Sequence, residues 1–319
     1  MPIVYIHGVA IRDDDEALAK ATKRFREVPW ETIREHLRAT VAPAISDNPA
    51  DVPITRIYWG DLGARFAWGG SSLVSRNLTA EVASTAVTPP EGESDESDGP
   101  DGRPATPTLR ERGIRRMRST VTAFRRPLEE FVPIFLGDVL TYVAWRGAAG
   151  APGPIPQRIL DGLETASTLA ESRREPLIVL THSMGGQILY DVLTHFAPRT
   201  PRYQGIRVDY WCATGSQVGF FEELKLFLES DPAYSAASGR RVPPMPGERL
   251  GGWWNVWDHA DLLSFRAGGI FEGVDDAAFF AAGALPTDHF KYLGSAEFYR
   301  MFATRVRASL ESRCDNDNT

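Results

Sequence analysis

The sequence has few cysteines and no long hydrophobic run. Only two of its 319 residues are cysteines, Cys212 and Cys314, and they stand 102 positions apart. This spacing offers neither a disulfide framework nor a metal site. No hydrophobic stretch approaches the roughly 20 residues that cross a bilayer. The apolar residues at the start also lack the basic segment that precedes them in a secretory signal. We therefore expect a cytoplasmic protein without a transmembrane segment.

Sequence motifs for cofactors are missing as well. The chain contains no Walker sequence, no dinucleotide-binding fingerprint and no cluster of metal-ligand residues. We therefore expect no cofactor and no metal ion. What is present is an ordinary globular composition, with 43% hydrophobic and 24% charged residues. This composition excludes a fibrous or wholly disordered chain.

The net charge of −7 is concentrated in one segment. Residues 89–102 (PPEGESDESDGPDG) hold six acids and no base, and removing those six negative charges leaves −1 for the rest. A nearly neutral body argues against nucleic-acid binding through phosphate neutralisation. Because the segment has no apolar side chain to bury, we expect a disordered acidic loop. It belongs to a long predicted insertion at residues 62–130.

A basic run follows the acidic segment, with seven arginines between positions 110 and 126. We favour a solvated helix face that balances the acidic loop. A peripheral contact with an anionic membrane or a partner is the alternative. A second question stays open for three apolar residues that stand among glycines and serines, Phe66, Trp68 and Leu73. They could belong to a lid over an apolar acyl pocket, to core packing or to a disordered linker.

Short apolar strands alternate with helical patterns along the chain. We predict strands at residues 3–6, 52–59, 177–180, 208–213 and 253–257. Helices are predicted at 13–40, 131–145, 159–172, 185–196, 220–228 and 295–310. Most of these strands are apolar on both faces, which is typical of a parallel sheet covered on both sides. The prediction is a single α/β domain over residues 1–319, with a mostly parallel sheet and helices on both faces.

The most informative segment is residues 177–188 (LIVLTHSMGGQI), where an apolar strand enters a sharp turn and a helix begins at once. This is the context of a nucleophile elbow, G-x-S-x-G, which presents a serine on a strained turn. Gly185 supplies the second small residue, whereas Thr181 replaces the first glycine. A serine before a helix can also be a simple cap. The combination of strand, turn and glycines favours a catalytic Ser183.

With these residues the sequence resembles the α/β-hydrolase superfamily, in particular its lipase-like serine esterases. The resemblance also rests on Ile6-His7-Gly8, on residues 137–142 (GDVLTY) and on Thr214-Gly215-Ser216. It implies the α/β-hydrolase fold and a catalytic triad in the chain order serine, acid, histidine.

Acyl transfer also needs N–H donors for the negative charge that develops on the carbonyl oxygen. One donor is expected at Met184, directly after the nucleophile. The resemblance implies the second donor just beyond His7-Gly8, at Val9, where glycine lets the backbone approach a substrate closely. An ordinary turn at the end of a strand is the alternative interpretation of His7-Gly8.

Three histidines follow Ser183 in the sequence. His195 lies three turns along the predicted elbow helix, away from its start. Too little chain separates His259 from the candidate acids. His289 stands in a predicted loop before the last helix, where the resemblance implies the base. We therefore assign the base to His289, with a surface histidine as the alternative.

Two acids follow the predicted strand at 253–257 and compete for the role of orienting the base. Asp258 directly follows the strand, whereas Asp261 lies in the turn and is followed by apolar residues. The second arrangement resembles that of lipase-like hydrolases, so we choose Asp261. Asp258 is then expected to cap or support the loop.

Together these residues predict a serine hydrolase that cleaves carboxylic esters through an acyl-enzyme intermediate. Ser183 attacks, His289 moves the proton and Asp261 orients His289. The resemblance implies a lipid-like or small-molecule ester as substrate. Two alternatives stay open: an acyltransferase or thioesterase with the same triad, and a non-catalytic binding protein on the hydrolase scaffold.

Overall fold

The computed structural model describes residues 2–13, 28–68, 71, 132–280 and 287–316. The chain divides into two compact units, residues 1–63 with 138–319, and residues 64–137. The first unit holds the central sheet and all five residues predicted for the site. The acidic loop at 89–102 and the arginines at 110–126 lie outside the described residues. The expectations for the insertion at 62–130 therefore stay predictions.

Six strands form the central sheet, in the order β2-β1-β5-β6-β7-β8. Their bounds are β1 Ile3–Ile6, β2 Ile54–Ile57, β5 Ile178–His182, β6 Tyr210–Thr214, β7 Trp253–Trp257 and β8 Asp275–Ala278. Every neighbouring pair in this sheet is parallel. A short antiparallel pair lies apart from it, β3 (Gly147–Ala148) with β4 (Ala151–Pro152). The predicted α/β class with a mostly parallel sheet is confirmed.

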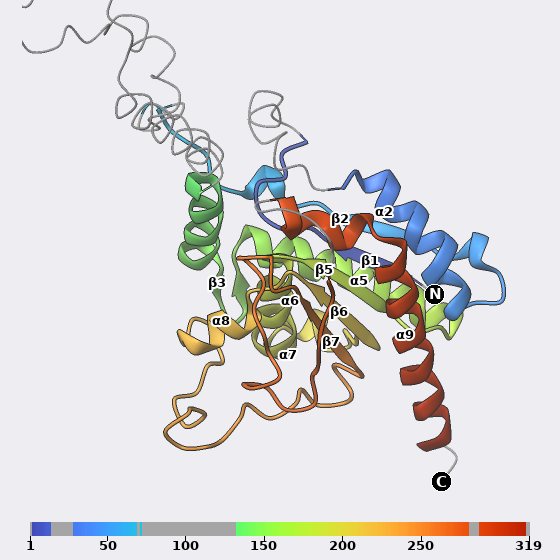
Figure 1. Cartoon of the computed structure of the whole chain (residues 1–319). Helices are drawn as coiled ribbons and strands as arrows, with labels where there is room; N and C mark the ends of the chain where they lie inside the picture. The colour runs from blue at the N-terminus through green and yellow to red at the C-terminus, as the bar shows by residue number, and fades with distance from the viewer. Residues whose placement is uncertain (1, 14–27, 69–70, 72–131, 281–286, 317–319) are drawn as a thin grey trace, which may run out of the picture. The chain divides into compact units, whose positions relative to one another are not determined.

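Helices lie between several of the strands (Figure 1). They are α2 (Trp30–His36), α5 (Pro154–Arg173), α6 (Gly185–Asp191), α7 (Ala197–Arg199), α8 (Val218–Glu223) and α9 (Ala296–Asn316), and residues 132–145 are also helical. Two π-helical turns, Leu37–Val41 and Val192–Phe196, continue α2 and α6. Short 3₁₀ helices lie at Ala42–Ala44, Pro49–Asp51, Gly60–Leu62, Pro201–Tyr203 and Thr287–Gly294.

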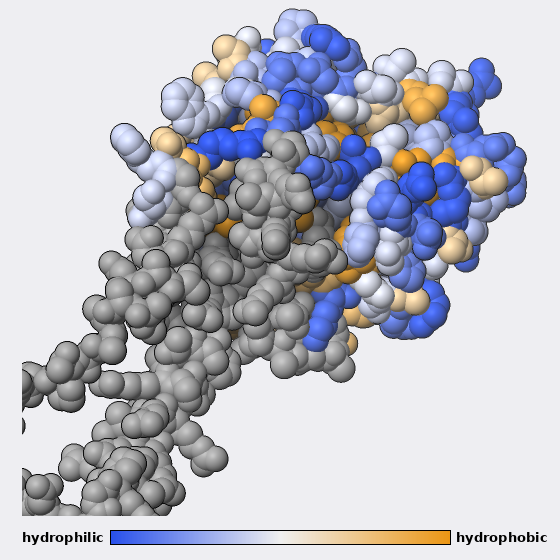
Figure 2. Space-filling view, turned by 90° about the horizontal axis from the view of Figure 1, so that it is seen from above, coloured by the Kyte–Doolittle hydropathy of each residue, from blue (hydrophilic) through white to orange (hydrophobic). Residues whose placement is uncertain are grey.

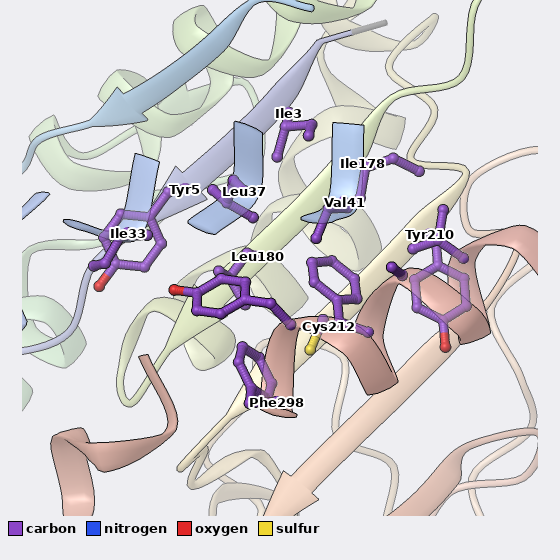
Figure 3. Packing of buried hydrophobic residues seen from close by; sticks show 14 of the residues in the cluster. Ile3, Tyr5, Ile33, Leu37, Val41, Ile178, Leu180, Tyr210, Cys212 and Phe298 are labelled. Atoms are coloured by element: carbon purple, nitrogen blue, oxygen red, sulfur yellow. The ribbon is translucent and has the colours of Figure 1, made fainter. Parts of the chain in front are cut away.

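Side chains alternate between the two faces of the sheet, so each strand contributes to two packed layers. On one face, Tyr5, Leu180 and Trp254 belong to a buried cluster with residues of α2, its π-helical turn and α9. Figure 3 shows part of this cluster, with Phe298 of α9 beside the strands. On the other face α5 packs on β1 and β2, and α6 packs on β5. Helices therefore cover both faces, as predicted.

Three details differ from the sequence prediction. Strand β8 was not predicted, because its sequence, Asp-Asp-Ala-Ala, has low strand propensity and only its pairing with β7 makes it a strand. Helix α5 begins at Pro154 and not at 159, since proline is well tolerated in the first helical turn. The segment around His289, predicted as a loop, is the 3₁₀ helix Thr287–Gly294.

Polar side chains dominate the face of the molecule seen in Figure 2, where hydrophobic residues form small separate groups. Within the described part of the chain, no helix combines the length and hydrophobicity needed to cross a bilayer.

Packing of α9 on the sheet gives a stability prediction. Phe302 is fully buried on α9 and contacts the rings of Trp254 and Tyr210. We expect Phe302→Ala to lower the free energy of unfolding by about 3–5 kcal/mol, because it removes a buried ring and leaves a cavity. Arg307→Ala on the exposed side of α9 should change it by no more than about 0.5 kcal/mol. Urea denaturation measures both, and equal effects would contradict the packing described here.

Candidate active site

Residues predicted for the site, or next to them in the sequence, follow the carboxyl ends of strands β1, β5 and β7. Gly8 comes after β1, Ser183 directly after β5, and Asp261 after β7. The carboxyl ends of parallel strands meet at one edge of a sheet, which is where ligands bind in open α/β folds. Strand pairing therefore gathers residues that are more than 250 positions apart in the sequence.

Ser183 lies in a tight turn between β5 and α6. Its φ angle is +52°, in the left-handed region that a residue with a side chain adopts at an energetic cost. The Ser183 N–H donates to the Thr214 carbonyl at 2.9 Å, and the Ser183 carbonyl accepts from the Gly186 N–H at 3.0 Å. These bonds attach the strained residue to β6 on one side and to the start of α6 on the other.

Two glycines make room for this turn. A β-carbon on Gly185 would lie 2.5 Å from the Ile6 carbonyl oxygen. A β-carbon on Gly8 would lie 2.6 Å from the Ser183 β-carbon and 3.2 Å from its Oγ. Any side chain at either position would collide with the elbow or with β1. The backbone after β1 therefore passes directly beside the Ser183 hydroxyl.

Thr181 stands where the usual elbow pattern has glycine, and its contacts explain how the larger residue fits. Its side chain is fully buried, and its Oγ1 accepts a hydrogen bond from the Trp211 indole N–H at 2.9 Å. The hydroxyl thus fixes a large aromatic ring of the neighbouring strand. Packing within the sheet therefore accommodates threonine at the position where the elbow pattern has glycine.

His289 and Asp261 form a close pair in the structure. The His289 Nδ1 lies 3.0 Å from Oδ1 and 2.9 Å from Oδ2 of Asp261. Because a carboxylate only accepts, Nδ1 carries the proton. The other ring nitrogen, Nε2, is buried and has no hydrogen-bond partner among the described residues. A neutral imidazole in this tautomer keeps a lone pair on Nε2, which a general base requires.

Asp261 is held as a carboxylate. Burial of the group acts to raise its pKa, but electrostatic attraction to His289 and hydrogen bonds from His289, Leu263 and Tyr292 outweigh burial and lower the pKa. The Leu263 N–H donates to Oδ1 at 2.9 Å, and the Tyr292 hydroxyl donates to Oδ2 at 3.0 Å. These donors leave Asp261 ionised and fixed in orientation.

Asp258 has a different position. Its Oδ1 accepts the Ala260 N–H at 2.9 Å, closing a small turn after β7, and its backbone N–H donates to Ser264 Oγ at 3.1 Å. The hydrogen bonds of the His289 ring go to Asp261 instead. The structure therefore brings His289 together with Asp261, and Asp258 closes the turn.

His182, the residue before Ser183, anchors the segment that carries His289. Its Nε2 lies 2.8 Å from the His289 carbonyl oxygen, so this nitrogen is the donor. The two imidazole rings also contact each other, with centroids 4.7 Å apart. Burial lowers the pKa of His182 from 6.5 to about 3. A neutral His182 thus fixes His289 relative to the elbow.

Gln217 also lies at the site, and the sequence analysis missed it. Its side-chain Nε2 donates to the Gly215 carbonyl at 2.8 Å and to the Leu263 carbonyl at 2.5 Å, and lies 3.5 Å from Ser183 Oγ. One amide therefore joins the end of β6, the turn of Asp261 and the side chain of Ser183. No local motif marks such a residue, because its partners come from three separate segments.

The two expected oxyanion donors are the backbone N–H groups of Met184 and Val9. Met184 follows Ser183 directly and is buried. Val9 follows Gly8, whose backbone passes the Ser183 hydroxyl. Among the described residues, neither N–H donates a hydrogen bond to another protein group. The oxyanion role of the two groups stays a prediction.

His7 fixes the backbone that leads to Val9. Its ring is fully buried and stacks on Trp59 at 5.0 Å between centroids. The Trp59 backbone N–H donates to Nε2 at 3.0 Å, so the proton is on Nδ1, which donates to the Gly8 carbonyl at 2.7 Å. Burial lowers the pKa of His7 to about 3, and the ring is therefore neutral at pH 7.

The remaining candidate histidines lie elsewhere. His195 pairs with Glu229 at 2.6 Å, beyond the end of α6. His259 contacts the rings of Trp257 and Phe280. Within the described ranges, no group of three or more His, Cys, Asp or Glu side chains could hold a metal ion.

No protein-family model matches this chain, and a search of curated proteins found no match.

The two buried neutral histidines predict a pH-dependent stability. Below about pH 6.5 the unfolded chain protonates His7 and His182, whereas the folded protein resists protonation down to about pH 3. Stability should therefore fall as the pH is lowered, by about 2–3 kcal/mol per histidine at pH 4.5. Urea denaturation at pH 7 and 4.5 measures the loss. His182→Gln should show a smaller loss than the wild type, and an equal loss would contradict the assignment.

Proposed function

We propose that this protein is a serine hydrolase of the α/β-hydrolase type that cleaves carboxylic esters, with Ser183, His289 and Asp261 as its triad. The observation that carries the proposal is the strained Ser183 at φ +52°, between a buried parallel strand and a helix. A structural cap does not require a left-handed serine. Strain of this kind persists at functional sites, where surrounding contacts hold it in place.

In the proposed reaction, Ser183 Oγ attacks the ester carbonyl while His289 Nε2 accepts the hydroxyl proton. The charge on the carbonyl oxygen is stabilised by the N–H groups of Val9 and Met184. His289 then returns the proton to the leaving alcohol, and a water molecule releases the acyl group by the same route in reverse. Asp261 keeps its charge throughout and stabilises the imidazolium.

The contact between nucleophile and base must tighten when substrate binds. In the structure Ser183 Oγ lies 3.5 Å from Gln217 Nε2, and within the described part of the chain His289 Nε2 has no hydrogen-bond partner. Catalytic hydrogen bonds are often long or misaligned without substrate and shorten in the reactive complex. Rotation of the Ser183 side chain away from Gln217 supplies the missing contact in this mechanism.

Exposed apolar residues on segments that follow the carboxyl ends of the strands support an ester with a hydrophobic acyl group. Phe220, Leu262 and Phe280 are 41%, 73% and 71% exposed. They follow β6, β7 and β8 respectively, so all three lie on segments that leave the carboxyl edge of the sheet. Exposed hydrophobic side chains beside a candidate site are a typical surface for an apolar ligand. A lipid-like or similarly hydrophobic ester is the substrate class that we propose.

Labelling with a fluorophosphonate tests whether Ser183 is activated. The reagent forms a covalent bond only with an activated serine, so a non-catalytic binding protein would not react. We expect wild-type protein to be labelled, and Ser183→Ala to lose both labelling and ester hydrolysis while its melting temperature shows that it is folded. The loss of rate should reach several orders of magnitude. Normal turnover by folded Ser183→Ala would contradict the triad.

Asp261 and Asp258 offer a matched pair of substitutions. Asp261→Asn should lower kcat by about 10²–10⁴-fold, because an amide removes the charge and allows the wrong histidine tautomer. Asp258→Asn should act mainly on stability, by about 0.5–2 kcal/mol, as expected for a weakened turn hydrogen bond. The measurements are kcat on a short-chain ester and a melting curve for each variant. If Asp258→Asn showed the large loss of kcat and Asp261→Asn did not, Asp258 would be the residue that orients His289.

A further inference from the structure

The loop that carries Val9 contains a second strained residue. Ala10 has φ +64°, again in the left-handed region that favours glycine. Its backbone N–H donates to Asp138 Oδ2 at 2.8 Å, across 128 positions of sequence. A non-glycine residue keeps such a conformation only where surrounding contacts impose it. The hydrogen bond to Asp138 is the contact that holds Ala10.

Asp138 is itself held by a buried cation. Its Oδ1 accepts a hydrogen bond from Arg12 Nη2, and neither side chain is exposed to solvent. The Nη1 of Arg12 donates to the Ile11 carbonyl at 3.1 Å. Asp138 and Arg12 thus bind the loop at two places, just after Val9. A buried ion pair adds little net stability compared with apolar packing. Stability alone therefore does not account for the buried pair of Asp138 and Arg12.

The contacts on either side of Val9 fix both of its peptide groups. The Gly8 carbonyl is bound by His7 Nδ1 at 2.7 Å, and the Ala10 N–H is bound by Asp138. In a planar trans peptide the N–H points opposite to the carbonyl. Fixing the Gly8 carbonyl therefore fixes the direction of the Val9 N–H. Fixing the Ala10 N–H holds the next peptide group, between Val9 and Ala10, so that its rotation cannot turn the Val9 N–H away.

We propose that Asp138, held by Arg12, is a positioning residue that fixes the Val9 N–H as an oxyanion donor. This inference rests on the proposed function, because it assigns Asp138 a role in stabilising charge on a substrate oxygen. Asp138 acts through the loop and does not touch the substrate. A donor of this kind works only when it is oriented before the charge develops.

The variant that tests the proposal is Asp138→Asn. The Ala10 N–H and Arg12 contact different oxygens of Asp138, so in Asn an NH2 group, which only donates, would face one of these two donors. The readout compares an ester with its thionoester, in which sulfur replaces the carbonyl oxygen. Sulfur accepts hydrogen bonds weakly, so an oriented oxyanion donor favours the oxygen ester far more than the thionoester. The ratio of the two kcat values reports on the donor, and a merely structural loss would not change it.

Asp191 provides a matched control within the same chain. It is also buried, and its carboxylate accepts a backbone N–H from Leu228 at 3.0 Å and a hydrogen bond from Arg146 at 2.9 Å. It lies at the far end of α6 from Ser183. Asp191→Asn therefore removes a similar buried charge without touching the loop of Val9.

We expect Asp138→Asn to lower kcat on the ester by about 10- to 100-fold, with KM little changed, because a small displacement of a catalytic group costs rates of this size. The thionoester should be affected much less, so the ratio of kcat values falls. Asp191→Asn should keep the wild-type ratio. If Asp138→Asn does not fold, Arg12→Lys is measured instead, since it keeps the buried charge but loosens the loop.

Two results would overturn the inference. If wild-type protein is labelled by fluorophosphonate but the folded Asp138→Asn or Arg12→Lys variant keeps the wild-type kcat ratio, the positioning role is wrong and the proposed function stands. If the wild type is neither labelled nor active on esters, the proposed function fails and the positioning role fails with it.

Discussion

The parallel pairing of β1 with β5 is the contact on which the rest of the candidate site depends. Ile6 lies opposite Thr181, so the residues that follow each strand leave the sheet side by side. This register puts Gly8 against Ser183, where no larger residue fits. A shift by one residue would separate these groups and turn every side chain of the strand to the opposite face.

Around this pairing, two neutral histidines donate hydrogen bonds that hold the candidate site together, and one carboxylate, Asp261, keeps its negative charge. The buried imidazoles of His7 and His182 have low pKa values and donate to backbone carbonyls, so they hold the segments without adding charge. Asp261 stays ionised because His289, Leu263 and Tyr292 all donate to it. In a water-poor environment such fixed dipoles act more strongly on a developing charge than they would in solvent.

The sequence predicted those parts of the structure that depend on local pattern. The apolar run before Ser183 predicts β5, and the order of acid and histidine predicts the pair that the structure brings together. Strand β8 and the role of Gln217 could not be predicted, because they depend on partners in distant segments. The same holds for Asp138, since its carboxylate meets Ala10 only after the chain has folded. Tertiary contacts of this kind leave no periodic signal in the sequence.

The most direct test of the account is a crystal structure of the protein after reaction with a fluorophosphonate that imitates the tetrahedral intermediate. The account predicts phosphorus bonded to Ser183 Oγ and the phosphoryl oxygen within hydrogen-bond distance of the Val9 and Met184 N–H groups. His289 Nε2 should then face the oxygen of the leaving-group position. Phosphorus on another residue, or a phosphoryl oxygen directed away from both N–H groups, would contradict the account.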